Sequence, residues 1–212
     1  MNGKLKIAIV DYGVGNLQSV QKAMENFNVE VFVTEEPEVI KKADALILPG
    51  VGSFEAGVKG LQLRGLVDVV REFAGQNKPM LGICLGAQLM LTQGYEFGIF
   101  QGLDIIAGKV VRFSPLKNQE KVPHVGWNTI YPPKNLSWSE TILNNLEDSQ
   151  VYFVHSYILE PNNTSDILSL TAYGGQTFCS AVKRGNIYGC QFHPEKSGVI
   201  GLSILENFIN SI

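Results

Sequence analysis

The stretch KPMLGICLGAQLM, residues 78–90, joins an apolar run to a helix-forming segment across a single cysteine. Residues 82–86 read G-x-C-x-G, the cysteine form of the G-x-S-x-G turn in which a strand passes sharply into a helix. Glycines relieve the backbone crowding of such a turn, while the residue between them projects above the end of the sheet. The stretch therefore predicts a strand–turn–helix unit of an α/β fold with Cys84 at its tip.

The remainder of the first half repeats this order of short apolar run and helix-period segment, which is typical of βαβ units and a largely parallel sheet. We expect strands at residues 5–10, 29–34, 45–48 and 79–83. Helices are expected at about residues 16–27, 37–42, 54–75 with a break near Gly65, and 85–92. Right-handed crossovers would build a doubly wound sheet flanked by helices.

The second half contains shorter strand-like runs separated by Asn, Pro and Gly: KVVRF, VYFVHSYIL, ILSLTA and CSAVKRGNIYGCQF. Antiparallel pairing is expected here, because Gly185-Asn186 in KRGN can take the positive φ of a hairpin turn. Residues 198–212 have helical period and should pack back on the sheet. The sequence thus predicts one α/β domain over residues 1–212, with antiparallel strands added in its C-terminal half.

Composition narrows the class of protein. Hydrophobic residues make up 45% of the 212 residues and charged residues 17%, which is typical of a globular domain. A net charge of −3 offers no basic surface for nucleic acid. Three cysteines without a C-x-x-C pair predict neither disulfides nor a metal site. Without a signal-peptide core or an 18-residue apolar segment, we expect no membrane association and a cytoplasmic location.

A thiol nucleophile needs a base, and the sequence favours His193 in FHPE among its three histidines. A residue before proline is extended, so His193 and Glu195 would project to similar sides, and the carboxylate could fix the imidazole tautomer. A solvated surface turn is the alternative for this motif alone. His124 and His155 have no acid at i+2, and His155 is interpreted as a structural, hydrogen-bonded imidazole.

An oxyanion hole would complete the site. The N–H of Leu85, directly after the nucleophile, is one expected donor. The other is expected in LPGVGSF, where Gly50 and Gly52 follow the strand at residues 45–48 and allow close approach of backbone amides. Phosphate binding is the competing interpretation of this loop, but the lysine and spacing of a P-loop are missing.

Five segments together resemble a known family: PGVGSF, GICLGAQ, KVPHVGWN, YFVHSY and YGCQFHPEKS. In this order they are similar to the class I, triad-type glutamine amidotransferases. The likeness runs from about Lys6 to Phe208 and thins across residues 114–121, 133–148 and 161–176. GICLGAQ and FHPE mark the superfamily, while PHVGWN and YFVHSY are similar to its histidine-pathway branch.

The resemblance implies an enzyme without a cofactor that hydrolyses L-glutamine. Cys84 would attack the side-chain amide, His193 would protonate the departing ammonia, and Glu195 would orient His193. Turning of the Val51 peptide would complete the oxyanion hole beside Gly52. The resemblance also implies substrate contacts, at Gln88, Glu96, Ser156 and Tyr157.

A partner is implied as well, because one glutaminase domain leaves no room for a second active site that consumes the ammonia. The resemblance implies a synthase or cyclase subunit, a (β/α)₈ barrel, in a heterodimer. The surface that meets it would include His124, Trp127, Asn128, Tyr152 and Lys196.

The segment LTQGYEFGIFQGLDIIAG departs from the histidine-pathway pattern, since Glu96 lacks its usual acidic companions. Relatives with FG and a following GL supply ammonia for amidination of surface sugars, so that paralogue remains an alternative. Two further alternatives are a partner-independent γ-glutamyl cysteine hydrolase and a non-catalytic flavodoxin-like module.

Overall fold

Two groups of strands make up the main sheet of the computed structural model, which describes residues 3–117 and 120–212. The first group is β1 (Lys6–Val10), β2 (Glu30–Thr34), β3 (Ala45–Leu48), β4 (Met80–Ile83) and β13 (Ile187–Cys190). The second group is β5 (Leu91–Gly94), β6 (Phe100–Gln101), β7 (Ile106–Arg112), β10 (Tyr157–Pro161), β11 (Ile167–Tyr173) and β12 (Gln176–Arg184).

These strands follow the order β2-β1-β3-β4-β13-β12-β10-β7-β5-β6, with β11 paired to β12. The first five strands in that order form four parallel pairs. Antiparallel pairs dominate beyond β13. The mixed sheet confirms the predicted fold class, and β12 and β13 form the predicted hairpin, with φ of +59° at Gly185.

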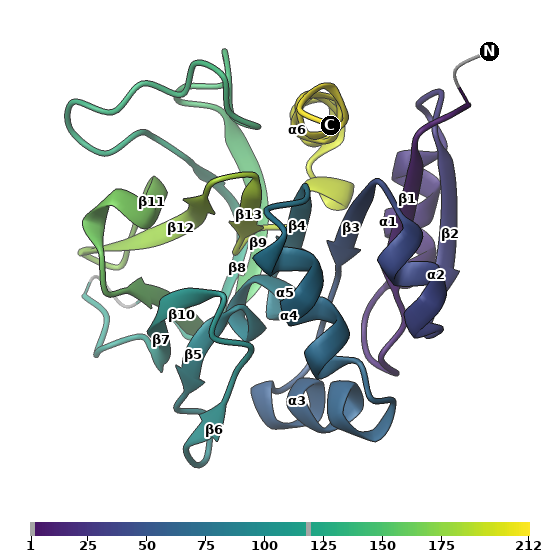
Figure 1. The fold of residues 1–212 in the computed structure, drawn as a ribbon. Coiled ribbons are helices and arrows are strands. Elements are labelled where there is room, and N and C mark those ends of the chain that lie inside the picture. The colour runs from purple at the N-terminus through teal and green to yellow at the C-terminus, as the bar shows by residue number, and fades with distance from the viewer. Residues whose placement is uncertain (1–2, 118–119) are drawn as a thin grey trace.

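Side-chain alternation along the strands separates two hydrophobic layers. Ile7 and Ile9 pack toward α1 (Leu17–Met24) and α6 (Gly198–Asn210), whereas Ala8 and Val10 face the other layer. That second layer is covered by α2 (Pro37–Lys42), α3 (Phe54–Leu63), α4 (Val67–Gly75) and α5 (Leu85–Leu89). Figure 1 shows the sheet running between these two sets of helices.

The predicted helix boundaries are partly confirmed. The helix expected at 54–75 is interrupted as predicted, between α3 and α4, where Gly65 has φ of +65°. The helix expected at 85–92 is wrong beyond Leu89. Residues from Leu91 onward form β5 instead, because their backbone pairs with β6 and β7. The helix expected at 16–27 is shorter in the structure, as α1.

A separate two-stranded sheet consists of β8 (His124–Thr129) and β9 (Gln150–His155). The run VYFVHSYIL therefore divides at Ser156. Its first part pairs with β8, and its second part continues as β10 in the main sheet. Residues just before and after Ser156 thus connect the two sheets.

Candidate active site

Cys84 lies between the end of β4 and the start of α5, as the G-x-C-x-G pattern predicts. Its own backbone has φ of +52° and ψ of −107°, a strained conformation for a residue with a β-carbon. Gly82 and Gly86 serve close packing instead: a β-carbon at Gly82 would lie 2.8 Å from Ala87 Cα, and one at Gly86 would overlap the Leu48 carbonyl oxygen. The turn therefore holds Cys84 at the carboxyl end of the parallel strands.

His193 reaches the same place because β13 is the parallel neighbour of β4. The Cys84 N–H donates to the Cys190 carbonyl at 2.7 Å, which aligns the two strand ends. His193 Nδ1 lies 2.8 Å from Glu195 Oε1, and both side chains are almost fully buried. Residues that are far apart in the sequence are thereby brought together.

The electrostatics of this group favour a charged imidazole. Burial alone would lower the pKa of His193, but the neighbouring Cys84 and Glu195 raise it to about 9. Among the described residues, His193 Nε2 has no hydrogen-bond partner, and this nitrogen is buried. Cys84 and His193 line the same cavity, and the imidazolium form of His193 is favoured by its interactions with Cys84 and Glu195.

A cavity of about 260 Å³ opens in front of Cys84 and His193. Gln88, Glu96, Ser156 and Tyr157 line it together with His155, and Val51, Gly52, Pro123 and Val154 complete the wall. The structure thus gathers the expected nucleophile, base and substrate-contacting residues around one space large enough for a small molecule.

Two of these lining residues are held by hydrogen bonds. Gln88 is buried, and its Nε2 donates to Gln191 Oε1 at 3.1 Å and to the Tyr157 carbonyl at 3.4 Å. Glu96 Oε2 accepts from the Phe54 N–H at 2.6 Å. Both side chains are therefore fixed before any ligand binds.

The loop after β3 lies directly beside Cys84 and Leu85. The Leu85 N–H donates to the Gly50 carbonyl at 3.4 Å, so the Gly50–Val51 peptide presents its oxygen to the expected oxyanion donor. The buried Tyr12 hydroxyl donates to the Pro49 carbonyl and anchors the start of this loop. Sequence reasoning missed Tyr12, because DYGVGNLQ matches no phosphate-binding pattern.

Gln191 is a second residue that sequence reasoning missed. Its side chain is fully buried, and its Nε2 donates to Cys84 Sγ at 3.7 Å. His193 is extended as predicted, but Glu195 lies in a 3₁₀ turn, Pro194–Lys196, so this turn and not strand alternation brings its carboxylate to His193. Gln191 follows the end of β13, and no pattern in the sequence marked its contact with Cys84. Cys179 and Cys190 are buried, and burial raises the pKa of both thiols.

His124 and His155 form a buried pair across β8 and β9. His155 Nδ1 must carry a proton, since it lies 2.8 Å from the Tyr157 carbonyl, which can only accept. His155 Nε2 then accepts from His124 Nδ1 at 3.0 Å, and His124 Nε2 accepts from Asn128 at 3.4 Å. Burial lowers the pKa of His124 to about 4 and that of His155 to about 3. Both rings are therefore neutral near pH 7, and their hydrogen bonds hold β8 and β9 together.

The residues expected at a partner surface divide between two sides of β8. Trp127 is 54% exposed and lies against Tyr152 of β9, with ring centroids 6.2 Å apart. The Tyr152 backbone carbonyl accepts from the His193 N–H, and its N–H donates to Ser197 Oγ. The exposed Lys196 lies between these two residues in the sequence. His124 and Asn128 instead turn inward, so their side chains do not belong to the Trp127 face.

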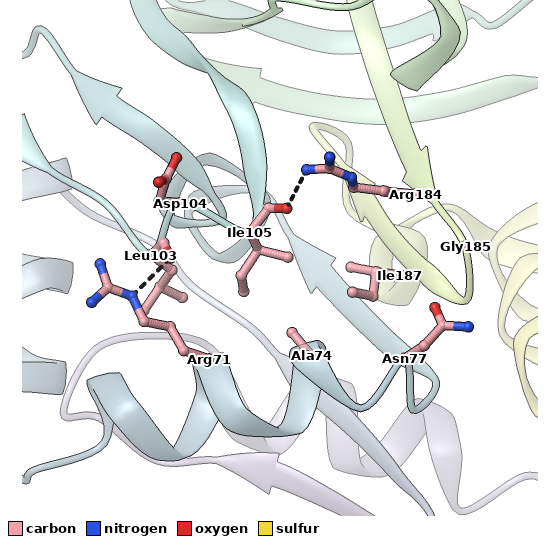
Figure 2. Close-up of a pocket in the computed structure, with 10 residues that line it drawn as sticks. Arg71, Ala74, Asn77, Leu103, Asp104, Ile105, Arg184, Gly185 and Ile187 are labelled. Carbon is pink, nitrogen blue, oxygen red and sulfur yellow. Dashed lines mark hydrogen bonds between the residues drawn. The ribbon is translucent and has the colours of Figure 1, made fainter.

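A hollow of about 740 Å³ lies at the opposite ends of the strands (Figure 2). Asn77 precedes β4 there, Arg184 is the last residue of β12, and Gly185 begins the turn that leads to β13. Arg71 donates to the Leu103 carbonyl at 2.9 Å, and Arg184 donates to the Ile105 carbonyl at 3.0 Å. These arginines hold the segment before β7 in place, far from Cys84 in the fold.

The fold and this site define a class of protein. The chain belongs to the class I glutamine amidotransferases, whose family model matches residues 8–212. It is accordingly a glutamine amidotransferase enzyme.

Individual relatives show which branch of the family this chain is most similar to among those compared. Imidazole glycerol phosphate synthase subunit HisH 1 of Legionella pneumophila strain Paris is 48% identical over 208 residues, which cover 96% of this chain and 98% of the relative. The HisH subunit of Archaeoglobus fulgidus is 47% identical over 208 residues, covering 97% and 98%. The solved structure of PurLQS from Thermotoga maritima is 16% identical, covers 98% of this chain and 99% of that chain, and has a TM-score of 0.73, which supports the fold alone.

No helix among the described residues has the length and apolar character needed to cross a bilayer. The same residues contain no group of three or more His, Cys, Asp or Glu side chains placed to hold a metal ion.

Proposed function

We propose that this chain is the glutaminase subunit of an imidazole glycerol phosphate synthase, in which Cys84, His193 and Glu195 release ammonia from L-glutamine for a synthase partner. The observation that carries the proposal is that Cys84 and His193 line one cavity of about 260 Å³, while Glu195 contacts His193 Nδ1 at 2.8 Å. Relatives that are 47–48% identical over almost their whole length bear this subunit's name.

The chemistry follows from the charges at the site. Cys84 Sγ attacks the side-chain amide carbon of glutamine, and the C–N bond breaks as His193 gives its proton to the departing nitrogen. Water, deprotonated by the now neutral His193, then cleaves the γ-glutamyl thioester and releases glutamate. Glu195 accepts the Nδ1–H of His193 at 2.8 Å and stabilises the imidazolium.

Oxyanion stabilisation requires a rearrangement of the loop after β3. In this structure the Leu85 N–H donates its hydrogen bond to the Gly50 carbonyl, so it cannot bind an oxyanion at the same time. Rotation of the Gly50–Val51 peptide would free this N–H and bring the Val51 N–H beside Gly52 toward the developing charge. One missing donor costs about 2.7–4 kcal/mol of transition-state stabilisation. Glutamine turnover measured with and without the synthase and its ligand tests this step, and equal rates would refute it.

The α-ammonium and α-carboxylate of glutamine need partners of their own in the cavity. Glu96 uses only Oε2 for the Phe54 N–H, which leaves Oε1 for the ammonium group. Gln88 and the backbone of Ser156 and Tyr157 line the same wall. We assign these four residues to substrate binding.

The partner in this proposal is a (β/α)₈-barrel cyclase that docks as a heterodimer in the cytoplasm. Trp127 and Lys196 contribute exposed side chains to the docking surface, and Tyr152 contributes a half-buried one. His124 and Asn128 contribute through their backbone. Ammonia would pass internally to the cyclase, which forms imidazole glycerol phosphate in histidine biosynthesis.

The decisive experiment uses Cys84→Ala in complex with the synthase subunit. Glutamine-dependent product formation should disappear, while activity with an added ammonium salt should persist, because the partner's site is untouched. Loss of both activities would contradict the role assigned to Cys84. A partner that amidinates a surface sugar instead of forming imidazole glycerol phosphate would identify the paralogous function.

A further inference from the structure

We propose that Gln191 is a catalytic residue whose side-chain N–H holds the Cys84 sulfur in its thiolate form. Gln191 Nε2 lies 3.7 Å from Cys84 Sγ, within hydrogen-bonding range for sulfur. Of the two side chains in this pair, Gln191 is the donor, so a full negative charge on sulfur strengthens the contact. The inference rests on the proposed role of Cys84 as nucleophile.

The orientation of the Gln191 amide is fixed by its other end. Gln88 Nε2 donates to Gln191 Oε1 at 3.1 Å, and Gln88 is itself held by the Tyr157 carbonyl. An amide whose oxygen accepts from Gln88 must turn its NH₂ group toward the sulfur. Gln191 is also held through its backbone, whose N–H donates to the Ser180 carbonyl at 2.9 Å.

Burial gives this contact its strength. Gln191 is 0% exposed, so water does not compete for the Nε2 protons. The donor favours the thiolate before attack. It also stabilises the sulfur as a leaving group when water cleaves the thioester, because the electron pair of the broken C–S bond returns to sulfur.

Other titratable groups surround the sulfur but do not replace this donor. His193, backed by Glu195, pairs electrostatically with Cys84. The charge of Cys84 also acts on the buried Tyr12, and His155 and Glu96 stand in the cavity wall. Substituting Gln191 leaves each of these groups in the protein, so a change in sulfur reactivity reports on the amide.

The test measures the rate of Cys84 alkylation by iodoacetamide against pH in the full chain, with the modified cysteine identified by peptide mapping. Gln191→Met keeps the length of the side chain and removes the donor. We expect the midpoint of the alkylation profile to rise by about one pH unit, which corresponds to a hydrogen bond to a charged group. Gln191→Glu should raise it further, because a carboxylate beside the sulfur repels the thiolate.

Gln101→Glu is the matched control, since Gln101 is exposed on β6 and its substitution should leave the profile unchanged. Profiles of Gln191→Met and Gln191→Glu that coincide with wild type would overturn the proposal. If wild-type Cys84 showed no preferential alkylation, the proposed nucleophile itself would be wrong.

A second readout does not require the Gln191 variants to fold. In the wild-type chain, the side-chain amide protons of Gln191 should shift in NMR spectra over the pH range in which alkylation begins. This shift should be absent in Cys84→Ala. Amide protons that do not respond to pH in the wild type would also overturn the proposal.

Discussion

His193 and Glu195 form a buried ion pair at the site. Both side chains are almost completely removed from water, and their 2.8 Å contact joins Nδ1 to Oε1. Glu195 Oε2 has no hydrogen-bond partner among the residues that the structure describes. The carboxylate therefore depends on the imidazolium for its stability, and the imidazolium depends on the carboxylate and on Cys84.

Glu195→Gln should weaken catalysis and change its pH dependence. Removing the carboxylate removes one of the two interactions that raise the pKa of His193, so that pKa falls from about 9. The alkaline limb of kcat/KM should move to lower pH, because the imidazolium is lost earlier as pH rises. We also expect kcat/KM to fall on the order of 10²-fold or more.

The matched control for this prediction is Glu147→Gln, an exposed carboxylate outside the site, which should leave the profile unchanged. An alkaline limb that stays in place for Glu195→Gln would show that Glu195 does not set the His193 charge. The same steady-state assay against glutamine covers both variants.

Among the secondary-structure elements, the packing of α5 against β3 and β4 determines where Cys84 stands. The helix has only five residues and is completely buried. Gly86 brings its first turn against the Leu48 carbonyl at the end of β3, and Gly82 allows β4 to pass close to Ala87. The loop from Pro49 to Gly52 begins at the same strand end. Cys84, the proposed nucleophile, and the loop proposed to stabilise the oxyanion therefore lie at the same tightly packed end of the sheet.

Gly86→Ala should destabilise the protein by about 1–3 kcal/mol, because its β-carbon would overlap a backbone oxygen that cannot rotate away. Glutaminase activity should fall with it, as α5 is displaced. Gly75→Ala is the control: nothing lies within 4 Å of a β-carbon there, at the end of α4. It should stabilise the chain by at most about 0.5–1 kcal/mol. Urea unfolding compares the two variants, and equal stabilities would contradict the packing argument.

Local patterns in the sequence identify the parallel half of the sheet well, because each strand there is a short apolar run followed by a helix. The strand from Ala45 to Leu48 has the predicted bounds. The C-terminal half is harder to predict, since pairing partners decide it. Leu91–Gly94 has the composition of a helix continuation and becomes a strand because β7 lies beside it. The contact of Gln191 with Cys84 likewise depends on strand order, which no single segment encodes.

Across the whole molecule, the exposed apolar side chains gather partly on the two-stranded sheet. Val125 and Trp127 alternate along β8 with the inward-facing His124 and Asn128. Trp127 is more than half exposed, although a tryptophan is normally buried or placed at an interface. This face lies next to Lys196, which follows Glu195, a member of the proposed triad, directly in the sequence. Docking there would place a partner close to the proposed site of ammonia release.

Trp127→Ala should weaken association with the synthase subunit about 30-fold, the effect of losing a contact of roughly 2 kcal/mol. Leu63→Ala removes another exposed apolar side chain, on α3, and should leave the affinity unchanged. Titration of each variant with the synthase subunit by calorimetry gives the dissociation constants. Equal weakening by both substitutions would contradict a docking role for the Trp127 face.

The division of one extended run at Ser156 has a mechanical consequence. Tyr152, in the ribbon of β8 and β9, and Ser156, in the cavity wall, are only four residues apart, and Ser156 lies at the bend between β9 and β10. Because a chain this short has a limited reach, a tilt of that ribbon would pull on the wall at Ser156. The width of the cavity in front of Cys84 would then depend on the angle at which the ribbon is held.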